Sequence, residues 1–175
     1  MAKSWNLGLI GAGNMGSALL HGVVNSKLLP GKRVWICDVD EDKAQALARL
    51  VGGHALDSNV EVFQKADTVI LAVKPQNFDD LLDEIWDRVN DIHLVISIAA
   101  GIPISRMTHR FGDKARVVRV MPNTAYLVGC GAAGVAAGGG ATVEDLERVL
   151  QIFGSAGLAV EVKESQINAV TGLSG

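Results

Sequence analysis

The sequence predicts an α/β fold with a doubly wound, mostly parallel sheet and helices on both faces. Short apolar runs of strand length alternate along the chain with segments whose apolar residues recur at helical spacing. The first apolar run, residues 7–10, leads directly into a glycine-rich turn and then a helix. In such sheets, ligands bind at the carboxyl ends of the strands, near the switch point beside the first strand. Functional residues are therefore expected at strand ends.

Composition limits the classes of protein that this chain can represent. Its 175 residues predict one domain, and a net charge of −3 with scattered basic residues argues against nucleic-acid binding. We find no apolar run of membrane-spanning length and no room for a signal peptide, so a cytoplasmic protein without membrane contact is expected. Cys37 and Cys130 are too few for a disulfide framework or a zinc site.

Periodicity and turn signals place the elements in order. In the first half we expect a helix over 14–27 with Met15, Ala18, Leu19 and Val23 buried, and strands over 33–38, 54–56 and 68–73. Asp40 is expected to cap a helix that ends at Gly52-Gly53. In the second half we expect helices over 78–89, 104–111, 142–154 and from 164 onward, and strands over 94–98, 116–121, 134–137 and 158–162. The strand over 134–137 is predicted to lie at an edge. Residues 142–145 (Thr142-Val143-Glu144-Asp145) are expected to open the next helix with a capping box, with Asp where Glu is usual.

The turn after the first strand fits the G-x-G-x-x-G pattern of dinucleotide sites, typical of Rossmann-type folds. Its residues are Gly11, Ala12, Gly13, Asn14, Met15 and Gly16. The three glycines permit a tight turn, close approach of the backbone to a pyrophosphate, and close packing of helix on strand. The following helix directs unpaired N–H groups and its positive dipole end at the phosphates.

Asp38 ends the second predicted strand, 22 positions after Gly16. An acidic residue there accepts hydrogen bonds from the adenosine ribose of NAD and repels the 2′-phosphate of NADP. The alternative is an aspartate that starts the next helix, although Asp40 is better placed as its cap. The sequence therefore favours NADH over NADPH.

Other strand ends carry less specific residues. Lys74 follows the fourth strand, where the nicotinamide half of a cofactor passes, but a solvated strand terminator is an equal alternative. Ser97 and the 99–101 turn leave room for a flat ring or simply form a buried turn. The histidines form no pattern of a nucleophile or metal site, and no catalytic acid or base is identified. Hydride transfer needs none where the substrate arrives as a protonated imine, because the cofactor supplies the chemistry.

Five strand-end motifs occur in order along the chain. They are Gly11–Gly16, Ala72-Val73-Lys74-Pro75, Ser97-Ile98-Ala99-Ala100-Gly101, Arg119-Val120-Met121-Pro122-Asn123-Thr124 and Ala169-Val170-Thr171-Gly172-Leu173-Ser174-Gly175. As a set they resemble pyrroline-5-carboxylate reductase. The resemblance implies reduction of 1-pyrroline-5-carboxylate to L-proline, in proline biosynthesis, with NADH or NADPH as donor.

The resemblance also implies roles for single residues. The glycine loop would hold the pyrophosphate, and residues 72–75 (Ala72, Val73, Lys74, Pro75) and 99–101 (Ala99, Ala100, Gly101) would border the ribose and nicotinamide. Asn59 matches a cofactor-contacting asparagine of the family, although it could simply start a helix. Met121 and Asn123 match the segment beside the substrate pocket. The position of Asp38 is commonly serine or a similar small residue in NADPH-using members, in line with NADH here.

The chain departs from the family pattern in two places. Ala125 replaces a frequent proline, which concerns only local turn geometry. More importantly, this sequence ends at Gly175, whereas members of the family continue into a helical C-terminal domain that forms the homo-oligomer and much of the substrate site. We therefore expect residues 1–163 to form the dinucleotide-binding domain and 164–175 to begin a linker helix, with cofactor binding but little activity alone. Two alternatives are the cofactor domain of a β-hydroxyacid dehydrogenase and a dinucleotide-binding sensor or scaffold module.

Overall fold

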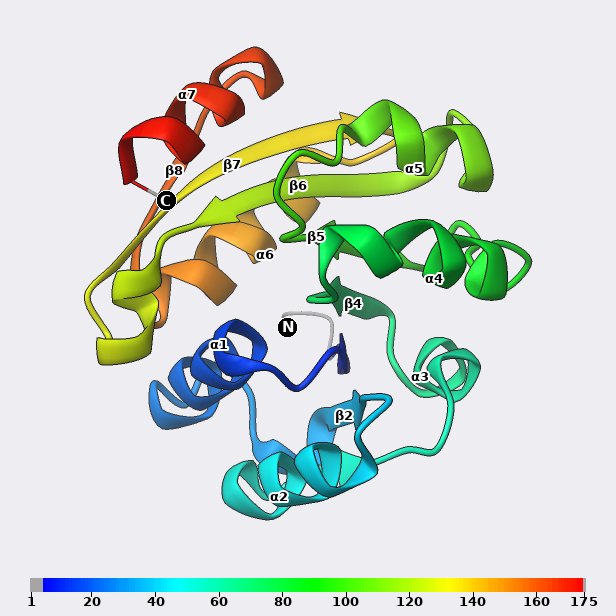
Figure 1. Ribbon diagram of the computed structural model, residues 1–175, viewed down its shortest axis with the longest axis vertical. Helices are drawn as coiled ribbons and strands as arrows, with labels where there is room; N and C mark the ends of the chain where they lie inside the picture. Colours follow the sequence, from blue (N-terminus) through cyan, green and yellow to red (C-terminus); the bar gives the residue numbers. More distant parts are fainter. Residues whose placement is uncertain (1–4, 175) are drawn as a thin grey trace.

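The computed structural model of the chain describes residues 5–174, with the backbone alone described at residues 171, 173 and 174. Its strands form one sheet in the order β3-β2-β1-β4-β5-β6-β7-β8, in which only the β6–β7 pair is antiparallel (Figure 1). The strands are β1 (Leu7–Ile10), β2 (Val34–Cys37), β3 (His54–Ala55), β4 (Thr68–Leu71), β5 (Leu94–Ser97), β6 (Arg116–Pro122), β7 (Gly131–Gly139) and β8 (Gly157–Glu161). The order reverses between β1 and β4, which places the switch point where the sequence predicts it.

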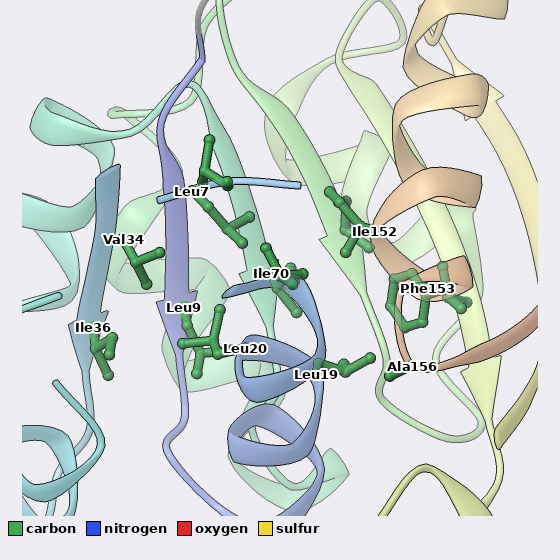
Figure 2. Close-up of a cluster of buried hydrophobic side chains, with 14 of the residues drawn as sticks. Leu7, Leu9, Leu19, Leu20, Val34, Ile36, Ile70, Ile152, Phe153 and Ala156 are labelled. Atoms are coloured by element: carbon green, nitrogen blue, oxygen red, sulfur yellow. The ribbon is translucent and has the colours of Figure 1, made fainter. Parts of the chain in front are cut away.

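Helices cover both faces of the sheet. They are α1 (Asn14–Asn25), α2 (Glu41–Val51), α3 (Asn59–Lys65), α4 (Phe78–Ile85), α5 (Ile104–Phe111), α6 (Val143–Gly154) and α7 (Glu164–Ser174), with short 3₁₀ turns η1 (Gly31–Arg33), η2 (Pro75–Asn77) and η3 (Thr124–Val128). One core lies under α1, α2 and α6, and the other under α3, α4, α5 and α7. Figure 2 shows the first core, where Leu9 and Ile70 from the sheet lie near Leu19 of α1 and Phe153 of α6. The two apolar faces explain why the central strands read as continuous apolar runs.

Capping residues fix the ends of two helices as predicted. The Asp40 carboxylate accepts a hydrogen bond from the Lys43 N–H at 3.3 Å, and Gly52 ends α2 with a φ of 68°. At α6, the Thr142 hydroxyl accepts from the Asp145 N–H at 3.2 Å, while the Asp145 carboxylate accepts from the Thr142 N–H at 2.9 Å. This reciprocal capping box confirms the prediction made for residues 142–145.

Several element predictions were wrong in detail. The strand predicted at the edge over 134–137 is an internal strand, β7, because the chain turns back through η3 and pairs β7 antiparallel to β6, leaving β8 at the edge. Helix α3 was not predicted, since only Val62 and Phe63 of its 7 residues are buried. The first and fourth helices end earlier than predicted, at Asn25 and Ile85.

Arg116 and Asp145 form a largely buried ion pair at the amino ends of the strands. Arg116 Nε donates to Asp145 Oδ2 at 2.9 Å, and Arg116 Nη2 donates to the second carboxylate oxygen. Burial favours the neutral acid, but the hydrogen bonds from Arg116 and Thr142 outweigh it and lower the pKa of Asp145 below its ordinary 3.8. The pair ties β6 to the start of α6, on the side of the sheet away from the strand ends where a ligand is expected.

His93 is buried at the start of β5. Its Nε2 lies 2.8 Å from the Phe63 carbonyl, and its Nδ1 lies 3.2 Å from the Asn90 nitrogen, whose N–H donates to it. The neutral ring protonated at Nε2 satisfies both contacts, whereas the charged ring would direct a second N–H at a donor. Desolvation lowers the pKa of His93 below its ordinary 6.5. This histidine is therefore structural, as the sequence suggested.

Over residues 5–174, we find no helix that is both long and apolar enough to cross a membrane.

Candidate functional site

Apart from Asn59, the predicted site residues lie at or just after the carboxyl ends of five neighbouring strands, in the order β2-β1-β4-β5-β6. This side of the sheet is called the carboxyl-end edge. Hydrogen bonds extend the strand pairing into the loops: the Gly11 N–H donates to the Cys37 carbonyl at 2.9 Å, and the Ala72 N–H donates to the Ile10 carbonyl at 2.8 Å. The Ile98 N–H in turn donates to the Leu71 carbonyl at 3.2 Å. The loops after β1, β2, β4 and β5 therefore start side by side.

The three motif glycines have different steric surroundings. A Cβ at Gly11 would lie 2.7 Å from the Ala72 carbonyl oxygen, and Gly11 has a φ of 103°, a conformation that favours glycine. A Cβ at Gly16 would lie 2.5 Å from the Gly11 carbonyl oxygen. At Gly13, by contrast, no described atom lies within 4 Å of where a Cβ would be. Two glycines thus permit close packing, and the third borders open space in front of the helix.

Gly13 is also the N-cap of α1, and no side chain of the described residues caps this helix. The backbone N–H groups of its first turn, at Asn14, Met15 and Gly16, have no partner within a regular helix. Open space, uncapped N–H groups and the positive end of the helix dipole together suit an anion such as a pyrophosphate.

Asp38 fixes the glycine loop from the neighbouring strand. Its Oδ2 accepts a hydrogen bond from the Ala12 N–H at 2.6 Å, and its Oδ1 accepts from the Asp40 N–H at 2.9 Å. The sequence predicted that Asp38 lies beside the loop, but not that it bonds to the loop. Ser17, which was not predicted, adds a second contact, since its hydroxyl donates to the Ala12 carbonyl at 3.2 Å. A serine directly after the last motif glycine is the signal that could have identified it.

The two loops that follow β4 and β5 lie farther along the same edge. Ala72 and Val73 are half-buried, while Lys74 and Pro75 are exposed and start η2. Ala99 is buried and its N–H donates to the Ser97 hydroxyl at 3.3 Å. Ala100 and Gly101 are exposed, and Gly101 has a φ of 76°. The small exposed residues Ala100 and Gly101 leave the turn after β5 accessible to a flat ring.

Asn59 is bonded through its side chain to Glu84 in this structure. It begins α3, after the Ser58 cap, and its Nδ2 donates to Glu84 Oε2 of α4 at 2.8 Å. Both side chains are exposed. The helix-start interpretation of Asn59 is therefore confirmed. Its Oδ1 is not engaged by the Glu84 bond.

Met121 and Asn123 lie at the carboxyl end of β6, where the sequence places the substrate segment. Met121 is half-buried against the second core. Asn123 forms hydrogen bonds with Ala132, near the start of β7. The Asn123 N–H donates to the Ala132 carbonyl at 3.0 Å, and its side-chain Oδ1 accepts from the Ala132 N–H at 3.0 Å. Asn123 therefore has a structural role at the β6–β7 return, whatever it contacts in addition.

Arg119, two residues before Met121, is almost fully buried. Its guanidinium lies 3.4 Å from Glu164 and donates to Asn168 Oδ1 at 3.0 Å. Glu164 also accepts the Ile104 N–H at 2.7 Å, at the start of α5. An arginine within a strand usually pairs with a carboxylate, and Arg119 does so here. Through Glu164 and Asn168 this contact links α7 to β6 and to the start of α5.

Within residues 5–174, the remaining reactive groups do not gather into a second site. Among the described residues, no group of three or more His, Cys, Asp or Glu side chains is placed to hold a metal ion. Cys37, at the end of β2, is buried, and burial together with nearby carboxylates raises the pKa of its thiol to about 11. Cys130 is exposed near the start of β7. The Cys37 thiol is therefore protonated at neutral pH and unsuited to nucleophilic chemistry.

Comparison with protein families decides the membership of the chain. Residues 6–101, more than half of the chain and the part that contains the glycine loop, match the family of NADP oxidoreductases described as coenzyme F420-dependent. The chain belongs to this family. The match covers β1 to β5 and the loops that follow them, so the NADP oxidoreductase family accounts for most of the site edge.

Curated relatives are similar to this chain over nearly its whole length. The chain is 42% identical over 173 residues to the pyrroline-5-carboxylate reductase of Methanosarcina acetivorans and 39% identical over 170 residues to that of Escherichia coli. These matches cover 99% and 97% of this chain, but 64% and 63% of the relatives. The chain thus spans less than two thirds of the length of these curated relatives.

Solved structures agree with the fold. The structure of a pyrroline-5-carboxylate reductase from Coxiella burnetii matches with a TM-score of 0.93 and 31% identity, over 99% of this chain and 64% of that one. The Plasmodium falciparum pyrroline carboxylate reductase, solved with NADP bound, matches with a TM-score of 0.87 and 30% identity, over 98% and 63%. The Rossmann-type α/β fold predicted from the sequence is confirmed.

Proposed function

We propose that this chain binds a nicotinamide dinucleotide at the carboxyl-end edge and forms the cofactor part of a reductase that converts 1-pyrroline-5-carboxylate to L-proline. The similarity to pyrroline-5-carboxylate reductases over nearly the whole chain supports the reaction. The dinucleotide fingerprint and its steric surroundings support the cofactor. Membership of an NADP oxidoreductase family agrees with both.

The open space at Gly13 is the observation on which the proposal depends. Gly11 and Gly16 are required by contacts within the fold itself, at 2.7 and 2.5 Å from carbonyl oxygens, whereas no described atom explains a glycine at position 13. A pyrophosphate seated against the start of α1 would explain it, because a Cβ would occupy the ligand's space.

The other predicted residues then follow the cofactor across the edge. Residues 11–16 hold the pyrophosphate, and Asp38 accepts hydrogen bonds from the adenosine ribose hydroxyls. Residues 72–75 and 99–101 border the ribose and nicotinamide. Asn59 would contact the cofactor through its Oδ1, which the bond to Glu84 does not use. We propose a preference for NADH, because the Asp38 carboxylate would repel a 2′-phosphate. The Plasmodium falciparum relative was solved with NADP bound, so the proposed preference concerns this chain and rests on Asp38.

The bound cofactor supplies the hydride, and the protein positions the acceptor carbon. Met121 and Asn123 lie where β6 ends and are proposed to face the substrate. No protein acid is assigned, because a protonated cyclic imine accepts hydride without one. The chain's own contribution is to orient the imine and to keep water from the reacting face.

Domain limits and assembly follow the same proposal. Residues 1–163 form the dinucleotide-binding domain, and residues 164–175 begin a linker helix. The curated relatives are longer than this chain, and their additional residues would supply the rest of the substrate site. Gly175 itself lies outside the described residues. We expect the functional protein to be a homo-oligomer in the cytoplasm, and the 175-residue chain alone to bind cofactor but turn over slowly.

Deuterium transfer tests this function. The chain, and a chimera that continues into the part of the Escherichia coli relative that this chain does not match, are incubated with 1-pyrroline-5-carboxylate and NADH carrying deuterium at C4. We expect proline with deuterium at the former imine carbon from the chimera, and slow turnover by the chain alone. Cofactor binding without deuterated proline from the chimera would contradict the reaction but not the cofactor. Rapid turnover by the chain alone would contradict the expected need for further structure.

A further inference from the structure

The outer edge of β8 is the longer of the two free edges of the sheet. Among the described residues, β8 pairs only with β7, while the opposite edge strand, β3, has just 2 residues. The segment Gly157–Glu161 contains no proline or lysine, the residues with which edge strands commonly block further pairing. Its free backbone groups can therefore accept another strand.

The direction of these backbone groups follows from the pairing with β7. The Ala156 carbonyl accepts from the Gly131 N–H at 3.4 Å, and the Val162 N–H donates to the Val135 carbonyl at 2.9 Å. Backbone groups alternate in direction along a strand, so the even-numbered residues of this segment face β7. Gly157, Ala159 and Glu161 consequently direct their N–H and C=O groups outward.

Two large aliphatic side chains are exposed on the same strand. Leu158 is 64% exposed and Val160 is 48% exposed, and they share one face because side chains alternate along a strand. Ala159 points to the other face, against the core under α6. Helix α7 packs mainly on β7 and β6.

We propose that β8 pairs antiparallel with β8 of a second copy of this chain, about a two-fold axis at Ala159. The outward groups are symmetric about this residue: Ala159 would pair with its own copy, and Gly157 with Glu161 of the copy, each as a hydrogen-bonded pair. Leu158 would then lie opposite Val160 of the copy in a non-hydrogen-bonded pair, where side chains approach most closely. The two sheets would continue into one.

Charge does not oppose this register. Glu161 lies opposite glycine in the copy, and the two copies of Glu161 lie at opposite ends of the paired segment. A second copy is preferred over an unrelated strand because one register satisfies both the outward backbone groups and the exposed aliphatic pair. The interface is isologous and closed, which limits assembly through this edge to a dimer. This inference goes beyond the proposed function and does not depend on cofactor binding.

Sedimentation equilibrium of the 175-residue chain over a range of concentrations tests the pairing. We expect a monomer–dimer equilibrium whose dissociation constant rises about tenfold or more in Leu158→Lys, because each dimer loses two apolar cross-strand pairs and gains two charges. Leu158 is exposed, so the variant should fold, which circular dichroism checks. The matched control is Leu50→Lys, an exposed leucine of α2 at 66%, which should leave the dimer unchanged.

Cross-linking tests the register. In a Cys130→Ser background, Ala159→Cys should form an intermolecular disulfide under mild oxidation, because hydrogen-bonded pairs place Cα atoms about 5.5 Å apart, within disulfide range. Val143→Cys, an exposed position on α6, should not. A chain that stays monomeric, or a dimer that withstands Leu158→Lys and does not cross-link through Ala159→Cys, would overturn the proposal.

Discussion

Asp38 Oδ2 lies 2.6 Å from the Ala12 backbone nitrogen and accepts its hydrogen bond. The carboxylate that the sequence assigns to ribose recognition is thus already joined to the loop that would hold the pyrophosphate. Its second oxygen accepts the Asp40 N–H at 2.9 Å, which orients the carboxylate plane. The residue proposed to select the cofactor therefore also holds the glycine loop.

Substitution of Asp38 should change cofactor preference. In Asp38→Ser, loss of the charge that would repel a 2′-phosphate should lower the Kd for NADPH relative to that for NADH by about tenfold or more. Both Kd values can rise because the Ala12 contact is lost, so the measurement is their ratio, from fluorescence titration with each cofactor. Asp40→Asn, an exposed acid two residues away, is the control. An unchanged ratio in Asp38→Ser would exclude the ribose role.

His93 should make stability depend on pH. Its folded-state pKa is lowered from the ordinary 6.5, so the unfolded chain binds a proton more readily than the folded chain. The contribution to the free energy of unfolding is complete above about pH 6.5 and is lost as the pH falls below it. Urea denaturation between pH 7.5 and about 5 should show this loss in the parent chain, and a flatter profile in His93→Gln. His109→Gln, on the exposed face of α5, should retain the parent slope.

The Arg116–Asp145 pair should be a large local contribution to stability. Asp145→Asn keeps the shape of the side chain but leaves a partly buried guanidinium without its counter-charge. We expect a loss of about 3 kcal/mol in the free energy of unfolding, measured by urea denaturation. Asp79→Asn removes the partner of the exposed Arg106 and should have a much smaller effect, because solvent screens that pair. Equal effects of the two substitutions would contradict the importance of burial.

The two cysteines should react at different rates. Cys130 is exposed, whereas Cys37 is buried with a thiol pKa raised to about 11. A thiol reagent such as DTNB should therefore label one cysteine quickly in the native chain and the second only on unfolding. In Cys130→Ser the rapid phase should disappear. A rapid phase that survives this substitution would place Cys37 at the surface.

The sequence predicts the parts of the fold that depend on local pattern. Strand β1, helix α5 and the caps at Asp40 and Thr142 were predicted because apolar periodicity and capping chemistry are local signals. The internal position of β7 was not, because it depends on an antiparallel return that glycine-rich residues 129–140 do not encode locally. Helix α3 was missed because it buries only two side chains.

The site was predicted at the level of strand ends, but its contacts were not. Topology brings the carboxyl ends of parallel strands together, so the positions of Asp38 and the glycine loop at one edge follow from the pattern. The Asp38 bond to Ala12, the Ser17 contact and the Asn59 bond to Glu84 depend on distances between elements, which periodicity does not determine. The cofactor and substrate roles of these residues stay predictions.

Titration of Gly13→Ala with NADH tests the central claim most directly. A Cβ at position 13 meets no described atom, so Gly13→Ala should have the same melting temperature as the parent chain. The control is Gly154→Ala, where a Cβ also meets no described atom and the melting temperature should likewise be unchanged. The account predicts saturable NADH binding by the parent chain and by Gly154→Ala, and binding weakened about tenfold or more in Gly13→Ala, since the new methyl group occupies the pyrophosphate position. Equal affinity of all three chains, or no binding at millimolar NADH or NADPH, would contradict it.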